Sequence, residues 1–210
     1  MSCVCSSFFF VKFQGTIYNN DGTTSYDKLL FAYAFGSGGA ENVRTTVSKL
    51  FNLPIDYYAV IDLETFSTLI DSVNGIDYDL QEDTRVRAIT RVVFDFNKGT
   101  NGLNGEEVVA LMMAATDGRN LSEENLLNLI LAVINKTENE MPQKQLKELM
   151  SQIETNLSLD QLLEKKIEIN SIKPLSLSGG IRDDMIDGKY FVMFEKDYLK
   201  SVAEELTTFN

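Results

Sequence analysis

Two acidic groups and one short loop contain the side chains best suited to bind a charged ligand. The acidic groups lie at residues 77–83 and 183–187, and carboxylates are the oxygen ligands that Mg²⁺ and Ca²⁺ take. Neither group has the ligand spacing of an EF-hand loop, and solvated strand ends are the commoner explanation of both. The loop spans residues 116–120, where Asp117 and Arg119 could bind a phosphate and its metal. A simple turn between two helices explains this loop equally well.

A methionine pair, Met112 and Met113, lies in an apolar stretch at residues 106–115 that predicts a buried helix. Methionine usually fills gaps in a protein core. The same residues would also suit a pocket for a lipid or a prenyl chain, and periodicity does not distinguish the two.

The composition excludes several kinds of chemistry. There is no histidine, so the chain has no histidine-based triad, general base or metal ligand. Cys3 and Cys5 are the only cysteines, too few and too close to the N-terminus for a zinc site or a disulfide framework. Nineteen Lys and Arg against 31 Asp and Glu give a net charge of −12, which repels phosphate backbones. We therefore expect no nucleic acid among the partners.

No stretch of the chain is predicted to span a membrane or to direct export. The apolar run from Phe8 to Val11 is far too short to cross a bilayer. It follows no basic stretch and precedes no signal cleavage pattern. We therefore expect no transmembrane segment and no targeting signal in the chain as given.

The elements that must position these residues alternate between strands and helices. Val43, Val47 and Phe51 have helical spacing, and alternating apolar and acidic residues predict a strand at 76–80. Other strands are predicted at 7–13, 15–18, 57–61, 92–96, 167–172 and 190–194, with a loop at 97–102. Other helices are predicted at 66–73, 106–115, 122–134, 142–153, 158–163 and 197–206. This order predicts an α/β fold, a three-layer α-β-α sandwich around a mixed central sheet.

The length and the balance of residues favour one domain. The chain has a mass of 23.6 kDa, with 44% hydrophobic and 24% charged residues, which suffices for one substantial core. It contains no repeat, linker or low-complexity tract. Residues 1–210 are therefore predicted to form a single domain.

Five segments resemble motifs of one protein family. Residues 28–39 read KLLFAYAFGSGG, similar to K-I-N-x-A-Y-A-x-G-G, and residues 53–62 read LPIDYYAVID, similar to I-P-I-D-Y-Y-V-x-V-D. Residues 66–79 resemble F-x-x-L-V-D-x-L-G-G-V-D-V-D, residues 103–107 resemble L-N-G-E-Q, and residues 155–158 resemble T-N-L-S. These are motifs of the LytR-CpsA-Psr family, and the resemblance extends in order over about residues 8–206.

The resemblance implies an activity as well as a fold. Members of the family are anchored in the membrane and act outside the cytoplasm, mostly in Gram-positive bacteria. Their activity is phosphotransfer, in which an anionic glycopolymer passes from a polyprenyl pyrophosphate carrier to peptidoglycan. Arginines and aspartates hold the pyrophosphate and Mg²⁺, and an apolar pocket takes the prenyl tail. Such a site fits the chemistry, because phosphoryl transfer depends on positioning and on neutralisation of charge.

Four polar residues match the family's site, and on this resemblance they are the candidate ligand-binding residues: Thr16, Lys28, Asp117 and Arg119. Each is also compatible with an ordinary surface loop or turn. Mg²⁺ is expected only if the pyrophosphate site is retained, and no catalytic residue is assigned. The implied partners are a polyprenyl-linked glycan or another lipid, and peptidoglycan, at the extracytoplasmic cell envelope.

The chain departs from the family at several charged positions. Gln14 stands at a family arginine and Gly15 at the adjacent aspartate, while Met113 and Ala115 stand at two further arginines. Residues 123–125 replace the family's R-Q-Q. The family's N-terminal strands and membrane helix have no counterpart in the chain as given.

Three functions remain open at this point. The leading hypothesis is a cell-envelope domain with impaired catalysis that binds a polyprenyl phosphate or another lipid-like ligand. The first alternative is a working phosphotransferase that uses Arg85, Arg87 or Arg91 as replacement cations. The second is a protein-interaction module without a ligand. An enzyme predicts arginines and a carboxylate at the mouth of an apolar cavity, a lipid-binding relic predicts the cavity alone, and an interaction module predicts a filled cavity.

Overall fold

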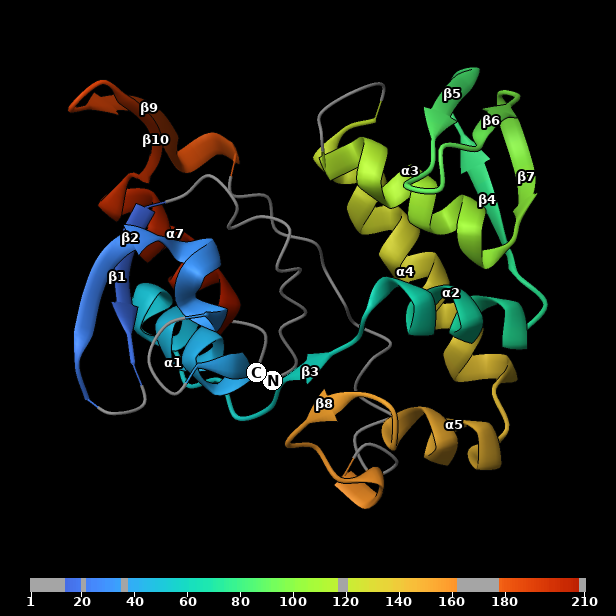
Figure 1. The fold of residues 1–210 in the computed structure, drawn as a ribbon, viewed down its shortest axis with the longest axis horizontal. Helices are drawn as coiled ribbons and strands as arrows, with labels where there is room; N and C mark the ends of the chain where they lie inside the picture. Colours follow the sequence, from blue (N-terminus) through green and yellow to red (C-terminus); the bar gives the residue numbers. More distant parts are fainter. Residues whose placement is uncertain (1–13, 20–21, 35–37, 117–120, 162–177, 208–210) are drawn as a thin grey trace. The chain divides into compact units, whose positions relative to one another are not determined.

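The computed structural model describes residues 14–19, 22–34, 38–116, 121–161 and 178–207 (Figure 1). The chain divides into two compact units. The first comprises residues 1–59, 155–158 and 175–210, and the second comprises residues 60–154 and 159–174. The chain passes from one unit to the other within β3 (Ala59–Val60) and β8 (Glu154–Thr155). That residues 1–210 form one domain stays a prediction.

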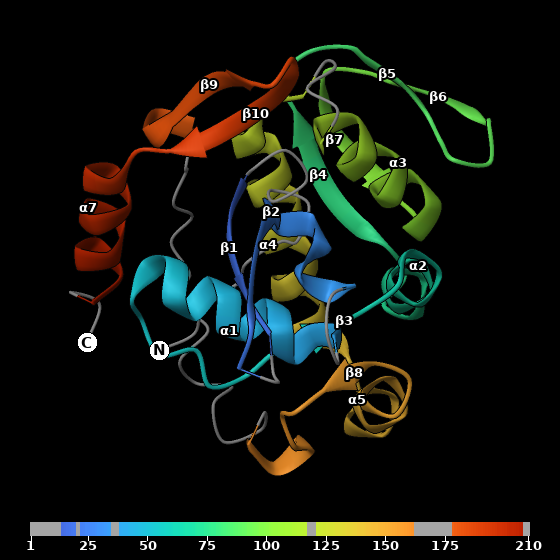
Figure 2. The same ribbon diagram turned by 60° about the vertical axis from the view of Figure 1, so that its left-hand side comes forward.

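The described part of the first unit contains two antiparallel hairpins and two α-helices. β1 (Gln14–Tyr18) pairs with β2 (Thr24–Lys28), and β9 (Ile181–Ile186) pairs with β10 (Lys189–Phe194). A short 3₁₀ helix, η2 (Leu29–Tyr33), follows β2, and another, η4 (Ser178–Gly180), precedes β9. α1 (Gly39–Phe51) packs along β1, and α7 (Lys196–Thr207) follows β10 (Figure 2).

Ile17 of β1 lies in the core of the first unit and is completely buried. Its neighbour Thr16 is exposed, because successive residues of a strand point to opposite faces. Val47 and Phe51 of α1 belong to the same core cluster, which confirms the helical spacing predicted for this segment. The cluster is completed by Ala32, Val192, Leu199 and Val202. Asn52 ends the helix in the left-handed conformation, with a φ of 52°.

A buried hydrogen-bond network joins α1 to the end of β1. Asn42 and Thr46 of α1 are 0% and 2% exposed. The Asn42 side-chain amide donates to Asn19 Oδ1 at 3.2 Å, and the Tyr18 N–H donates to Thr46 Oγ1 at 3.1 Å. Because these polar groups are shielded from water, the hydrogen bonds fix the β1–β2 turn against the helix.

The second unit packs helices against two pairs of antiparallel strands. Helices with described bounds in this unit are α2 (Leu63–Ser72), α3 (Gly105–Thr116), α4 (Glu123–Glu140) and α5 (Gln143–Met150). β4 (Ile76–Leu80) pairs with β7 (Gly99–Leu103), and β5 (Thr84–Arg87) pairs with β6 (Val93–Phe96). α3 contacts α2, α4 and β5 and is the central helix of the unit (Figure 1). Among the described helices, none combines the length and the apolar character needed to cross a membrane.

The apolar residues of β4 and α3 form the core of the second unit. The apolar positions of β4 are buried and the two aspartates between them are exposed, as predicted from their alternation. In α3, Val108 and Leu111 have no exposed surface, and Met112 is 5% exposed. Met112 therefore fills the core, in line with the more ordinary interpretation of the methionine pair.

The mixed α/β class predicted from the sequence is confirmed, and four of its described strand pairs are antiparallel. The loop predicted at 97–102 is wrong, because most of it belongs to β7. The β4 ladder supplies hydrogen bonds to residues of low strand propensity, and the Asn101 side chain donates to the carbonyl oxygen of Asn97 at 2.8 Å. The strand predicted at 57–61 is reduced to the two residues of β3. The strands predicted at 7–13 and 167–172 lie outside the described residues.

Candidate functional site

The β1–β2 ladder contains two of the four candidate residues. Its register sets Gln14 opposite Lys28, Gly15 opposite Asp27 and Thr16 opposite Tyr26. Thr16 lies on the exposed face, away from the core. The two positions at which a family arginine and aspartate are replaced therefore have a lysine and an aspartate directly across the ladder.

This register brings charged residues level with the positions that have lost a charge. Directly opposite residues of antiparallel strands share a face, with their Cβ positions about 4.5–5.5 Å apart. Asp27 therefore places a carboxylate beside Gly15, and the backbone of Lys28 lies level with Gln14. The sequence pointed to Lys28 through the family motif but gave no reason to select Asp27, because the register of the hairpin was not known.

Asp117 and Arg119 lie outside the described residues, between α3 and α4. The described residues that follow them begin α4 with a capping box. Ser122 Oγ accepts a hydrogen bond from the Asn125 N–H at 3.2 Å, and Asn125 Oδ1 accepts one from the Ser122 N–H at 2.9 Å. Asn125 is one of the residues that replace the family's R-Q-Q, and here its side chain stabilises a helix N-terminus.

The capped start of α4 is also tied to the core strand β4. The Tyr78 hydroxyl donates to the carbonyl oxygen of Asn125 at 3.0 Å, and burial raises the pKa of Tyr78. This phenol therefore keeps its proton at neutral pH and acts as a hydrogen-bond donor. Its contact ties the start of α4 to β4.

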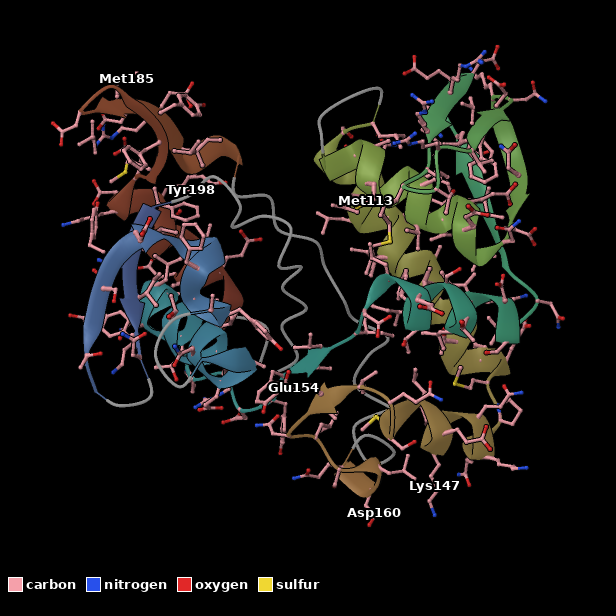
Figure 3. All side chains as sticks on the ribbon, in the orientation of Figure 1. Met113, Lys147, Glu154, Asp160, Met185 and Tyr198 are labelled. Atoms are coloured by element: carbon pink, nitrogen blue, oxygen red, sulfur yellow. The ribbon has the colours of Figure 1, made fainter. Side chains whose placement is uncertain are left out.

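The last two turns of α3 contain no charged side chain. Ala115 is buried at 8% exposure, and Met113 is partly exposed on the same helix (Figure 3). These are the positions matched to two family arginines. The C-terminal part of α3 therefore offers apolar atoms where the family's pattern has cations.

The three arginines proposed as replacement cations lie on the β5–β6 hairpin. Val86 is buried, whereas Arg85 and Arg87 are exposed on the other face of β5, away from the packed core. Arg85 Nη1 lies 3.4 Å from Asp95 Oδ1 across the ladder. The Arg87 Nε–H donates to the carbonyl oxygen of Arg91 at 3.5 Å. All three arginine side chains of this hairpin are exposed.

The two acidic groups form hydrogen bonds and an ion pair with their neighbours. Asp79 accepts hydrogen bonds from the side chains of Gln81 and Thr100, and Asp83 accepts one from the Lys98 N–H. In the second group, Asp184 forms an ion pair with Arg182 at 3.0 Å, and a hydrogen bond to Asp183 raises the pKa of Tyr190. Across the described ranges, no group of three or more acidic or cysteine side chains is arranged to hold a metal ion.

An open polar depression lies where the ends of α2, β4 and β7 meet the start of α3. Several of its polar side chains already have partners. Asp71 Oδ1 accepts a hydrogen bond from the Gly105 N–H at 2.7 Å, and Asn104 and Glu107 cap each other's backbone at 2.8 and 3.0 Å. These contacts are helix caps, and none of the candidate ligand-binding residues lines the depression.

The comparisons with known proteins agree with the motifs and the fold. A sequence model of the LytR_cpsA_psr family matches residues 14–208, and the chain therefore belongs to the LytR-CpsA-Psr family. The chain is 30% identical over 151 residues to TagV of Bacillus subtilis, which is named as a polyisoprenyl-teichoic acid–peptidoglycan teichoic acid transferase. The match covers 67% of this chain and 38% of TagV. The chain is 24% identical over 192 residues to TagT of the same organism, which has the same activity in its name, covering 86% of this chain and 58% of TagT. The chain thus spans 38% and 58% of the length of these two relatives.

Solved structures show the same fold. The crystal structure of TagV from Bacillus subtilis has a TM-score of 0.69 at 24% identity, covering 92% of this chain and 80% of that one. A structure of TagT with bound octaprenyl pyrophosphate lipid also has a TM-score of 0.69 at 24% identity, covering 91% and 73%. The α/β fold is therefore that of LytR-CpsA-Psr proteins.

Proposed function

We propose that this chain is a LytR-CpsA-Psr domain of the extracytoplasmic cell envelope that binds a polyprenyl phosphate or another lipid-like ligand and is impaired in phosphotransfer. The ligand class is supported by family membership and by TagT, a protein of similar fold that holds octaprenyl pyrophosphate. The location is supported by the curated relatives, whose names give teichoic acid and peptidoglycan as their substrates.

The absence of charged side chains from the last two turns of α3 is the observation that supports impaired phosphotransfer. Phosphotransfer breaks the P–O–P bond of the pyrophosphate and releases the polyprenyl phosphate, and cations near these oxygens are needed because negative charge accumulates there in the transition state. Met113 and Ala115 supply none, and Ala115 is buried. Loss of one such electrostatic contact costs about 3–4 kcal/mol of transition-state stabilisation. Several losses together leave little transferase rate, although their effects need not add.

A retained phosphotransferase is the alternative, and the β1–β2 register favours it. The backbone of Lys28 lies directly across from Gln14, and Asp27 lies directly across from Gly15. In this alternative, Lys28 contacts a phosphate and Thr16 donates a hydrogen bond from the same hairpin. Mg²⁺ would neutralise charge on the pyrophosphate, but the alternation of strand residues puts Asp27 on the face opposite to Thr16, so Asp27 is not assigned as its ligand.

Native mass spectrometry of the purified chain tests the proposal. A short-chain polyprenyl pyrophosphate, the monophosphate and the prenyl alcohol are compared, each with and without Mg²⁺. We expect the three to bind with similar affinity and with little effect of Mg²⁺, because the apolar chain supplies most of the binding energy. Pyrophosphate binding that strengthens with Mg²⁺ would favour the phosphotransferase. Binding of none of the three would contradict both ligand hypotheses and leave the protein-interaction module.

A variant that restores a positive charge tests whether the end of α3 contributes to ligand binding. Met113→Arg returns one cation to α3 at a partly exposed position, and Met185→Arg makes the same change on the β9–β10 hairpin (Figure 3). We expect Met113→Arg alone to raise the affinity for the pyrophosphate above that for the prenyl alcohol. Equal effects of the two variants would mean that the end of α3 does not face the ligand.

A further inference from the structure

The β5–β6 hairpin is a basic element in an acidic protein. Residues 84–96 contain three arginines, one aspartate and no other charged residue, which gives a local charge of +2 in a chain of net charge −12. The acidic residues 82 and 83 lie at the open end of the hairpin, and Asp83 is engaged by the Lys98 N–H at 2.8 Å. The positive charge is therefore concentrated towards the turn.

Exposed apolar side chains accompany these arginines. Ile89 is 65% exposed, Val92 46% and Val93 41%. The register sets Arg87 opposite Val93, so a guanidinium and an apolar side chain share the outer face. The inner face is anchored, because Val86 and Phe96 are buried. The hairpin thus presents one face to the core and a mixed cationic and apolar face to its surroundings.

The turn of the hairpin is well defined. The Arg91 N–H donates to the carbonyl oxygen of Ala88 at 2.9 Å, and the Ala88 N–H donates to that of Val92 at 2.8 Å. Thr90 Oγ1 donates to Glu106 Oε1 at 2.6 Å, which ties the turn to the first turn of α3. Arg91 has a φ of +71°, a conformation that this type of three-residue turn usually gives to glycine. An arginine at this strained position adds a cation between Ile89 and Val92.

The β9–β10 hairpin provides an internal comparison. Met185 is 63% exposed and Tyr190 50%, so this hairpin also presents apolar surface to its surroundings. Residues 181–194, however, contain two basic and three acidic side chains. Exposed apolar residues are therefore common to both hairpins, and a positive charge beside them distinguishes β5–β6.

We propose that the β5–β6 hairpin is a membrane-contact surface that binds an anionic lipid bilayer. Its arginines would bind the headgroup phosphates, which guanidinium groups contact with paired hydrogen bonds. Ile89 and Val92 would enter the boundary between headgroups and acyl chains. A water-soluble polyanion would satisfy the arginines but would leave these apolar side chains in water, and for this reason the observations favour the lipid surface. The inference does not depend on the proposed function, since it rests on the β5–β6 hairpin and uses none of the four candidate ligand-binding residues.

Co-sedimentation of the full chain with lipid vesicles tests the inference. We expect binding to vesicles of phosphatidylglycerol and little binding to vesicles of phosphatidylcholine. Raising the salt concentration from about 50 mM to about 500 mM should weaken the binding, because salt screens the charges of the arginines. Equal binding to the two lipids, or no binding to either, would overturn the inference.

Variants assign the binding to the hairpin. Each arginine near an anionic surface is expected to contribute about fivefold in affinity, so the triple variant Arg85→Gln, Arg87→Gln, Arg91→Gln should bind about a hundredfold more weakly. Ile89→Ser should weaken binding severalfold, whereas its matched control Met185→Ser, at a side chain of nearly equal exposure, should not. Arg182→Gln is the control for the loss of a surface arginine. Circular dichroism of each variant verifies that it is folded.

Competition with a soluble polyanion tests whether the hairpin binds a charged polymer instead of a lipid bilayer. Polyphosphate should compete with the vesicles only weakly, since it offers no apolar phase. If polyphosphate binds as tightly as the vesicles and Ile89→Ser leaves its binding unchanged, the hairpin binds a charged polymer and the membrane proposal is wrong. If the triple variant binds vesicles like the native chain, the hairpin is not the contact surface.

Discussion

Asn156 hydrogen-bonds to the backbone of Tyr58, a residue 98 positions earlier in the chain, with 2.9 Å between the Tyr58 nitrogen and Asn156 Oδ1. The same side chain donates through Nδ2 to the carbonyl oxygen of Asp56 at 2.8 Å, and the Thr155 hydroxyl donates to the carbonyl oxygen of Tyr58. These residues belong to two of the motifs that carry the family resemblance. The two motifs are therefore joined by hydrogen bonds, and both have a structural role in the first unit.

Asn156→Ala should lower the free energy of unfolding by about 1–2 kcal/mol. The substitution removes two hydrogen bonds that join distant segments, and each contributes about 1 kcal/mol. Urea denaturation measures the change. The control is Asn139→Ala, since Asn139 donates only within its own helix, to the Asn135 carbonyl oxygen at 2.8 Å. Its effect should stay below about 0.5 kcal/mol. If the two variants lose the same stability, the contact between the motifs is not a stabilising one.

Gly75→Ala should destabilise the chain by more than Gly22→Ala. Both glycines have a positive φ, +78° and +84°, so alanine at either position costs about 1–2 kcal/mol of backbone strain. A Cβ at Gly75 would also lie 2.4 Å from the carbonyl oxygen of Leu103, whereas one at Gly22 would meet nothing within 4 Å. The crowding should add about 1–3 kcal/mol at Gly75.

Thermal and urea unfolding of the two glycine variants measure this difference. The comparison isolates the contact between the end of α2 and β7, because the strain in the backbone is nearly the same in both. An equal loss of stability would contradict the close approach of Gly75 to Leu103.

The periodic elements were the ones that the sequence predicted well. The spacing of Val43, Val47 and Phe51 predicted α1, and each of the latter two lies in the core. Ile76 and Leu80 are buried and the two aspartates between them are exposed, as simple alternation along a strand predicts. In such elements one face is apolar and buried, so the spacing of the apolar residues predicts whether the element is a helix or a strand.

The hairpins were predicted less well, for two physical reasons. β5 and β7 are stabilised by their partner strands, and their sequences, TRVR and GTNGL, are too polar to be recognised as strands. The register is a second problem, because it depends on the turn between the strands. Nothing in the sequence set Asp27 opposite Gly15, so the charged pair nearest the replaced positions became evident only in the structure.

The ion pair between Glu41 and Arg44 should give the first unit a pH-dependent stability. A side-chain hydrogen bond from Arg44 lowers the pKa of Glu41 from its ordinary value of 4.5. A carboxylate with a lowered pKa in the folded state contributes stability that is present above pH 4.5. This contribution is lost as the pH falls through the lower pKa of the folded state. Arg44 also donates to the carbonyl oxygen of Ile55, which links α1 to the segment that precedes β3.

Urea unfolding at a series of acidic pH values tests this coupling. Glu41→Gln should reduce the dependence of stability on pH below about 4.5, because the titrating carboxyl group is removed. Arg44→Gln should reduce the same part of the curve, and the double variant should show no further change. Additive effects of the two substitutions would show that Arg44 does not lower the pKa of Glu41.

Lys28→Ala should have little effect on the affinity for a polyprenyl pyrophosphate, less than about threefold, if the proposed function is correct. In that function the prenyl chain supplies most of the binding energy, and the charges of the head group are poorly matched. A hydrogen bond to a charged group is worth about 1.5–3 kcal/mol, so a lysine that holds a phosphate would cost more than about tenfold on removal. The control is Lys147→Ala on α5, whose side chain is exposed in the other unit (Figure 3). Native mass spectrometry measures both variants with the pyrophosphate and with the prenyl alcohol. A loss above tenfold for Lys28→Ala with the pyrophosphate alone would mean that a phosphate site survives on the β1–β2 hairpin, and it would favour the working phosphotransferase over the impaired domain.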